Sequence, residues 1–253
     1  MANQTEQDTV TVLEAKVWST MPAQFRHSGR TSDHSINQKL GRLLDSFIEG
    51  PVFVPGMARL FLADIPYGRI FSIDTNTREW SLVIEYDGEP TGLAWHPSNQ
   101  KIVIADFKQG ILELDVHSGE LKPLAARYHG ERFKGPNDLV IAADGSIFFT
   151  DQGMTGLHDP TGHVYRLSLE GHLDLIISNG PSPNGLVFNL NETALFVAMT
   201  RDNSIWHVPF HPDGSVQRVG RFASYYGIGG PDGLALDSEG NLFVAHSTLG
   251  KIF

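Results

Sequence analysis

The chain repeats one pattern of short apolar segments and turns, and this periodicity constrains its fold more than any other feature. Each unit starts with a Gly/Pro turn and an apolar run such as GLAW or GLVF, followed by two further apolar runs between polar turns. The units begin at residues 49, 88, 134, 181 and 229. Such short runs, rich in Val, Ile, Phe and Leu and bounded by turn residues, indicate β-strands rather than helices.

Three or four strands per unit, repeated about every 40 to 50 residues, are the signature of a β-propeller. A β-sandwich is the alternative, but it has no need of the same turn chemistry at the same place in every unit. The sequence stops at Phe253, inside the third strand of the fifth unit. Because an open sheet edge exposes unpaired backbone groups, we expect either a further segment or an unusual closure of the ring.

The repeats divide the chain into two parts. Residues 1–35 are more polar and fit no repeat, so they are predicted to form an N-terminal segment that packs on or near the propeller. Residues 36–253 are predicted to form the propeller domain. Residues 36–48 suit either a turn of helix or a strand that leads into the first unit, and the sequence leaves both readings open.

Charge and composition exclude several classes of function. Nineteen basic and 29 acidic residues give a formal net charge of −10, which disfavours nucleic acid and suits a cation or a small polar molecule. The chain has no cysteine, so disulfides, thiolate nucleophiles and cysteine-ligated zinc are excluded. The first 20 residues lack a basic start with an apolar core, and no apolar run is long enough for a membrane span. We therefore predict a cytoplasmic protein with a small-molecule substrate; no oligomeric state is predicted.

Polar residues recur at one position of the repeat, beside the first apolar run. They are Glu49, Asn137, Asn184 and Asp232, and the second unit has Pro90 and Thr91 at this place. The innermost strand of each propeller blade lies beside the central channel, so residues at one repeat position converge on the channel axis. Carboxylate and amide oxygens are the ligands that Ca²⁺, Mg²⁺ or Mn²⁺ prefers. The alternative is that Asn and Asp here are ordinary turn residues bonded to their own backbone.

The last residue of the second apolar run also follows a pattern. Asp64, Asp106 and Asp151 end this run in the first three units, which predicts a structural hydrogen bond between blades rather than a catalytic role. His246 ends the run LFVAH in the fifth unit and is a candidate to face the channel. Because histidine binds both substrates and metals, His246 is predicted as a substrate-binding residue.

The segments EGPVF, GPNDLVIAADGSIFFTD, SPNGLVF and GPDGLALDSEGNLFVAH together resemble the SMP-30/gluconolactonase/luciferin-regenerating-enzyme family. The likeness runs from about residue 45 to residue 253. This family contains six-bladed β-propellers, among them lactonases and, more distantly, phosphotriesterases of the diisopropylfluorophosphatase type. The resemblance implies an all-β, six-bladed propeller, of which the sequence displays five units, the last incomplete at its C-terminal end.

The resemblance also implies a site. A divalent cation, Ca²⁺ first and Zn²⁺, Mn²⁺ or Mg²⁺ as alternatives, would be held by Glu49, Asn184 and Asp232. Asp232 would in addition be the catalytic acid and base, and Asn137 would lie on the metal or the substrate. The segment AARYHGERF should approach the substrate by its position, which makes Arg132 a substrate-binding candidate.

The function expected from these residues is metal-dependent opening of a small lactone. The cation would polarise the carbonyl, and Asp232 would assist the attack of water. A phosphotriesterase-like hydrolase uses the same arrangement and is the alternative within the enzymes. A recruited member of a biosynthetic pathway and a non-catalytic ligand-binding propeller are the further alternatives, because a fold does not determine a function.

Overall fold

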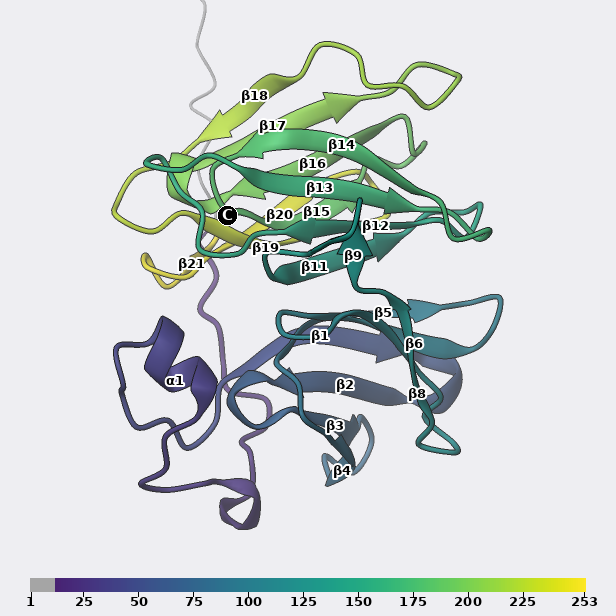
Figure 1. The fold of residues 1–253 in the computed structure, drawn as a ribbon. Helices are drawn as coiled ribbons and strands as arrows, with labels where there is room; N and C mark the ends of the chain where they lie inside the picture. The colour runs from purple at the N-terminus through teal and green to yellow at the C-terminus, as the bar shows by residue number, and fades with distance from the viewer. Residues whose placement is uncertain (1–11) are drawn as a thin grey trace, which may run out of the picture.

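The computed structural model describes residues 12–253, which form five antiparallel sheets arranged one after another along the chain (Figure 1). Blade 1 contains β1 (Ile48–Val54), β2 (Arg59–Asp64), β3 (Arg69–Asp74) and β4 (Trp80–Glu85). Blade 2 contains β5 (Pro90–His96), β6 (Lys101–Asp106), β7 (Gly110–Leu114) and β8 (Leu121–Ala125). Blade 3 contains β11 (Pro136–Ile141), β12 (Ile147–Asp151), β13 (Gly162–Leu167) and β14 (Leu173–Gly180). The prediction of an all-β propeller is confirmed.

The remaining two sheets complete the described part of the propeller. Blade 4 contains β15 (Pro183–Phe188), β16 (Ala194–Met199), β17 (Ser204–Pro209) and β18 (Gly220–Ser224). Blade 5 contains β19 (Pro231–Leu236), β20 (Leu242–His246) and β21 (Lys251–Ile252). A small hairpin between blades 2 and 3 is formed by β9 (Arg127–Tyr128) and β10 (Glu131–Arg132). In each blade the first strand is innermost, and β1, β5, β11, β15 and β19 contact one another in this order.

Within residues 12–253, helical structure is limited to α1 (Asp33–Gln38) and four 3₁₀ turns. The turns are η1 (Ala23–Phe25), η2 (Pro55–Met57), η3 (Ile65–Tyr67) and η4 (Thr200–Asp202). None of the helices in residues 12–253 combines the length and the apolar character that crossing a bilayer requires.

Apolar clusters fill the spaces between neighbouring blades and hold the propeller together. Within residues 12–253 there are four, and each contains large side chains of two adjacent sheets: Phe61 with Ile104, Ile111 with Phe149, Phe148 with Leu195, and Ile205 with Val244. Burying apolar surface contributes about 25 cal/mol per Å², so these contacts are the main source of stability. No cluster of this kind joins blade 5 to blade 1 in the described chain.

The ring is therefore open between blades 5 and 1, and five sheets are present where the resemblance implied six. The glycines of the inner strands in blades 1, 4 and 5 show the same break. A Cβ on Gly50 or Gly185 would lie within 2.6 Å of the backbone of the next blade, whereas a Cβ on Gly233 of blade 5 would meet no atom within 4 Å. The place beside Gly233 is the place that a sixth inner strand would fill.

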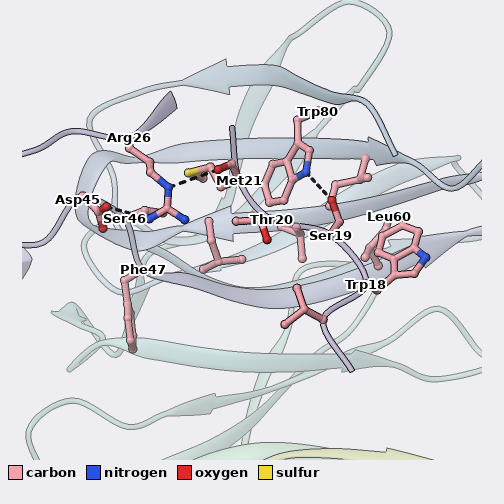
Figure 2. Close-up of a pocket in the computed structure, with 14 residues that line it drawn as sticks. Trp18, Ser19, Thr20, Met21, Arg26, Asp45, Ser46, Phe47, Leu60 and Trp80 are labelled. Carbon is pink, nitrogen blue, oxygen red and sulfur yellow. Dashed lines mark hydrogen bonds and ion pairs between the residues drawn. The ribbon is translucent and has the colours of Figure 1, made fainter. Parts of the chain in front are cut away.

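The segment before blade 1 packs along the face of blade 1 that has no neighbouring blade. Trp80 Nε1 donates a hydrogen bond to Ser19 Oγ at 2.9 Å, and Arg26 forms an ion pair with Asp45 at 2.8 Å (Figure 2). Between this segment and the sheet lies a cavity of about 490 Å³, with Leu60 of β2 in its lining. The segment thus covers apolar surface that a sixth blade would otherwise contact.

Residues 36–48, which the sequence left open between helix and strand, contain parts of both. The helix α1 ends at Gln38 and the strand β1 begins at Ile48. The start of α1 is fixed by a capping box, in which Ser32 and Ser35 each accept a hydrogen bond from the other's backbone amide. The helix therefore begins before residue 36, inside the segment predicted to precede the propeller.

The aspartates that end the second strand of blades 1 to 3 have a structural role, as predicted, but the backbone amides that they bind belong to their own blade and not to a neighbouring one. All three carboxylates are buried, and each accepts hydrogen bonds from backbone amides in the connection that enters the inner strand of its blade. The pairs are Phe47 N to Asp64 at 2.8 Å, Glu89 N to Asp106 at 3.0 Å, and Gly135 N to Asp151 at 2.7 Å. These bonds fix the start of each inner strand, and with it the residues at the channel.

Candidate active site

The predicted site residues of the inner strands lie where the pairing with the second strand is interrupted. Register shifts occur in all five blades, between Glu49 and Val52, Pro90 and Gly92, Pro136 and Leu139, Pro183 and Leu186, and Pro231 and Leu234. A β-bulge bends its strand and re-aims side chains, and bulges are frequent beside active sites. The repeat therefore provides one irregular position per blade at the same end of the channel.

Glycines next to these positions allow the inner strands of adjacent blades to approach each other closely. A Cβ on Gly92 would lie 2.7 Å from the carbonyl oxygen of Asn137, and a Cβ on Gly185 would lie 2.4 Å from that of Asp232. Cβ atoms do not occur at such distances, so glycine is required at both places. Close approach of the strands brings the polar residues of different blades to one region.

Three carboxylates influence one another electrostatically in this region, and we refer to Glu49, Asp138 and Asp232 as the acidic cluster. Burial raises the pKa of Glu49 to about 8, and the charge of Asp232 adds to the effect. Burial also raises the pKa of Asp138 to about 7, with a further contribution from Asp232. Each carboxylate is thus destabilised as an anion by loss of water and by the other negative charges.

Asp232 has the largest set of polar partners in the acidic cluster. Burial raises the pKa of its carboxyl, while hydrogen bonds from Ser247 and Asn184 act in the opposite direction. The nearby Lys39 and His246 also lower this pKa. The structure therefore brings together four of the predicted residues, namely Glu49, Asn184, Asp232 and His246.

His246 is buried beside Asp232, with 1% of its surface exposed. Neither ring nitrogen has a hydrogen-bond partner among residues 12–253. The ring packs edge-on to Tyr225 at 5.6 Å between centroids and lies 6.1 Å from the ring of Phe253. A buried imidazole whose ring nitrogens have no hydrogen-bond partner can still bind a ligand or a proton. This observation supports the prediction that His246 binds substrate, which stays a prediction.

Asn137 is oriented by a chain of side-chain hydrogen bonds at the start of blade 3. Its amide Nδ2 donates to Gln152 Oε1 at 2.9 Å, and Gln152 Nε2 donates to Ser182 Oγ at 2.9 Å. These bonds fix which end of the Asn137 amide is the acceptor, so its oxygen remains available. Thr91 of blade 2 donates to the carbonyl oxygens of Ala105 and Pro136, so its hydroxyl has a structural function.

Arg132 lies outside this group. It is exposed in the hairpin β9–β10, where its backbone pairs with that of Arg127. Within residues 12–253, no hydrogen bond or ion pair connects its guanidinium to the acidic cluster. A role of Arg132 in substrate binding stays a prediction from the sequence.

The donors present fit a hard divalent cation. Ca²⁺ and Mg²⁺ bind oxygen ligands that carry or adjoin negative charge. The site offers two carboxylates, whose negative charges act on each other, and the amide oxygen of the buried Asn184. No three His, Asp or Glu side chains in residues 12–253 lie close enough to hold a metal ion by themselves. A cation here therefore depends on the amide of Asn184 and on further oxygen donors.

Two charged residues of the site were missed by the sequence reasoning. Asp138 occupies the repeat position that is glycine in the other units, Gly50, Gly92, Gly185 and Gly233. This exception to the glycine pattern was a signal that could have identified it. Lys39 belongs to the segment before the repeats, so no repeat position indicated it.

Comparisons with known proteins show which family the chain resembles in sequence and in fold. Residues 47–253 match the family described as the SMP-30/Gluconolactonase/LRE-like region. A gluconolactonase of Zymomonas mobilis is 31% identical, with 78% of this chain and 64% of that protein covered. A lactonase drp35 of Staphylococcus haemolyticus is 27% identical, with 76% of this chain and 61% of that protein covered. The chain thus spans less than two thirds of the length of these relatives.

Solved structures show the same fold. A gluconolactonase from Xanthomonas campestris superposes with a TM-score of 0.70 at 27% identity, covering 79% of this chain and 70% of that one. The calcium-binding protein regucalcin from Agrobacterium tumefaciens superposes with a TM-score of 0.68 at 22% identity, covering 79% and 67%, respectively. Together with the match of the family over residues 47–253, this shows that the chain belongs to the SMP-30/gluconolactonase/LRE-like family.

Proposed function

We propose that this protein hydrolyses a small lactone, with Asp232 as the general base and acid. The observation that carries the proposal is the environment of Asp232. Burial raises the pKa of its partly buried carboxyl, Asn184 and Ser247 lower this pKa, and the charge of Asp232 in turn raises the pKa of Glu49. The relatives named gluconolactonase and lactonase support the substrate class. A small neutral or polar substrate also suits the net charge of −10.

Asp232 can do two things in this reaction. As a carboxylate it accepts a proton from the water that attacks the lactone carbonyl, and as an acid it returns the proton to the leaving alkoxide. A pKa raised by burial brings the carboxyl closer to neutral pH, where both proton transfers are efficient. Asn184 and Ser247 hold the carboxylate in place during these steps, which limits the cost of orienting it.

A divalent cation is part of the proposal, with Ca²⁺ as the first choice. Glu49, Asn184 and Asp232 would hold it, because their oxygens have the right chemistry and the acidic cluster lacks sufficient compensating charge. When bound, such an ion supplies Lewis acidity toward a carbonyl oxygen. Asn137 would contact the substrate, and the bond to Gln152 that sets its amide orientation supports this role.

The complete site would belong to a propeller of six blades, as the family resemblance implies. The open space beside Gly233 supports a further sheet between blades 5 and 1. A cytoplasmic location also remains part of the proposal.

The test is hydrolysis of a panel of γ- and δ-lactones, with paraoxon as the phosphotriester, before and after treatment with EDTA. Lactone opening that EDTA abolishes and Ca²⁺ restores is the expected result. Turnover of paraoxon but of no lactone would favour the phosphotriesterase alternative. Binding of small molecules without any turnover would favour a non-catalytic propeller.

A further inference from the structure

One position of the repeat supplies side chains that act on the start of an inner strand. It is the residue directly after the second strand of each blade, apolar in blades 1 and 2 and polar in the next three, as Gln152, Thr200 and Ser247. Ser247 lowers the pKa of the Asp232 carboxyl. Thr200 Oγ1 donates a hydrogen bond to the carbonyl oxygen of Pro231 at 2.7 Å. The same position in blade 3 is therefore a candidate to support a site residue.

The backbone of Gln152 is fixed on both sides of its side chain. Its amide donates a hydrogen bond to the carbonyl oxygen of Gly135 at 3.0 Å, and Gly135 directly precedes β11. Its own carbonyl oxygen accepts a hydrogen bond from the buried Thr155 Oγ1 at 2.7 Å. The Gln152 side chain therefore extends from a defined place beside the start of the inner strand of blade 3.

The side-chain amide of Gln152 connects two inner strands. Its Oε1 accepts a hydrogen bond from Asn137 Nδ2 at 2.9 Å, and its Nε2 donates one to Ser182 Oγ at 2.9 Å. Asn137 lies in β11, and Ser182 directly precedes β15, the strand that carries Asn184. The strand before Gln152, β12, contacts both β11 and β15 (Figure 1). One amide thus bridges Asn137 in blade 3 and the entrance of blade 4.

Ser182 provides a fixed end for this bridge because it is held from several sides. It is buried, and its φ of 65° lies in the left-handed region that residues other than glycine rarely adopt. Its amide donates to Thr155 Oγ1 at 3.1 Å, and its carbonyl oxygen accepts from the amide of Thr200 at 3.0 Å. A backbone in this region persists where the surrounding contacts impose it, and such residues cluster at functional sites.

We propose that Gln152 is a positioning residue, which holds the Asn137 amide in one orientation and so presents its oxygen to the substrate. This inference rests on the proposed lactonase function, in which Asn137 contacts the substrate. The terminal torsion of an asparagine is broad, so a half-buried Asn137 without this bond would present either its oxygen or its nitrogen. Fixing the amide before binding removes the cost of ordering it in the complex.

The kinetic test replaces Gln152 by Leu, which removes both bonds and nearly keeps the size of the side chain. With D-glucono-δ-lactone and saturating Ca²⁺, we expect KM to rise about fivefold, because one neutral hydrogen bond to the substrate is weakened. The kcat should change by less than about twofold, because ground state and transition state lose the same contact. Gln152→Glu should restore KM, since a carboxylate still accepts from Asn137 Nδ2 and the Ser182 hydroxyl can rotate to donate.

A double-mutant cycle shows whether Gln152 acts through Asn137. In Asn137→Ala, the further change Gln152→Leu should alter KM by less than about twofold, because no amide is left to orient. Gln217→Leu is the matched control and should leave KM and kcat unchanged, since the exposed Gln217 donates to the carbonyl oxygen of Phe210 at the opposite end of blade 4. Effects of the two changes that simply multiply, or an unaltered KM in Gln152→Leu, would overturn the proposal.

A measurement without turnover separates this inference from the lactonase proposal. The side-chain amide signals of Asn137 in a ¹H–¹⁵N NMR spectrum are identified by their loss in Asn137→Ala. They should shift in Gln152→Leu and in Ser182→Ala, and stay in place in Gln217→Leu. These shifts would support the positioning role even if no lactone is opened. Hydrolysis by the wild type, with Asn137 signals that do not change in Gln152→Leu, would support the lactonase and refute the role of Gln152.

Discussion

Asn184 lowers the pKa of the Asp232 carboxyl, although the two residues lie in inner strands of different blades. The two strands, β15 and β19, come close together at Gly185, where a Cβ would lie 2.4 Å from the carbonyl oxygen of Asp232. The carboxylate that we propose as catalytic is thus influenced by a residue about one repeat earlier in the sequence. Changes that alter the spacing of the two blades should therefore affect the site as much as changes of the site residues themselves.

Replacing Asp232 by Asn should abolish most hydrolysis and preserve the fold. The amide has the shape of the carboxyl but cannot take up the proton of water, and acid–base help of this kind contributes about 10²- to 10⁴-fold. The measurement is kcat for lactone opening, with a thermal melt to verify folding. Asp237→Asn is the control, since Asp237 lies in an exposed turn of the same blade. Near-normal turnover of Asp232→Asn would refute its role.

Replacing Glu49 by Gln should weaken binding of Ca²⁺ before it affects anything else. The substitution removes one negative charge from the acidic cluster and keeps the size of the side chain. Isothermal titration with Ca²⁺ should show at least about a tenfold loss of affinity, which is 1.4 kcal/mol. An affinity equal to that of the wild type would show that Glu49 is not a ligand.

The free energy of unfolding should fall as the pH rises from about 5 to 8 when EDTA is present. The unfolded chain releases the protons of Glu49 and Asp138 near their ordinary pKa values, whereas the folded protein retains them up to about 8 and about 7. The folded state then binds more protons, so its stability is greatest below pH 4.5 and is lost as the pH passes the folded pKa values.

Each pKa unit of this shift corresponds to about 1.4 kcal/mol. Urea unfolding at about pH 5 and about pH 8 measures the difference in the free energy of unfolding. In Glu49→Gln the free energy of unfolding should fall less over this pH range, because glutamine does not bind a proton and only Asp138 still contributes. A wild-type stability that rises with pH in EDTA would contradict the arrangement of the acidic cluster.

Two glycine substitutions should have opposite outcomes. Gly185→Ala places a methyl group 2.4 Å from the carbonyl oxygen of Asp232, so blades 4 and 5 must separate. Loss of stability by about 1–3 kcal/mol, together with loss of hydrolysis, is expected from overpacking of this kind. Gly233→Ala adds the same group where no atom lies within 4 Å, and it should be tolerated. Thermal melts and lactone assays of the two variants make the comparison, and equal effects would argue against close packing of the inner strands.

Much of this architecture could be predicted because every blade has to meet the same structural requirements. Each sheet needs a turn, a strand at the channel and apolar faces, so repeat position predicted which residues face the axis. Glu49, Asn184 and Asp232 were found in this way, and the structure places them together. The same reasoning was sufficient for the aspartates that fix the inner strands.

Residues outside the repeat could not be found by such reasoning. The position of Lys39 depends on how α1 docks, which is determined by contacts of Gln38 and His34 with Glu89 over more than 50 residues of sequence. The repeat pattern displayed five units and the described chain forms five blades, whereas the sixth blade came only from the family resemblance. Long-range packing decided the position of Lys39.

The acidic cluster joins the first and the last blade of the described chain, since Glu49 lies in β1 and Asp232 in β19. During folding the early sheets can stack pairwise as soon as they form, but the two carboxylates meet only after all intervening sheets are in place. Binding of the proposed ion should therefore be the final event of refolding. A spectroscopic signal of ion binding would then report when the whole molecule has assembled.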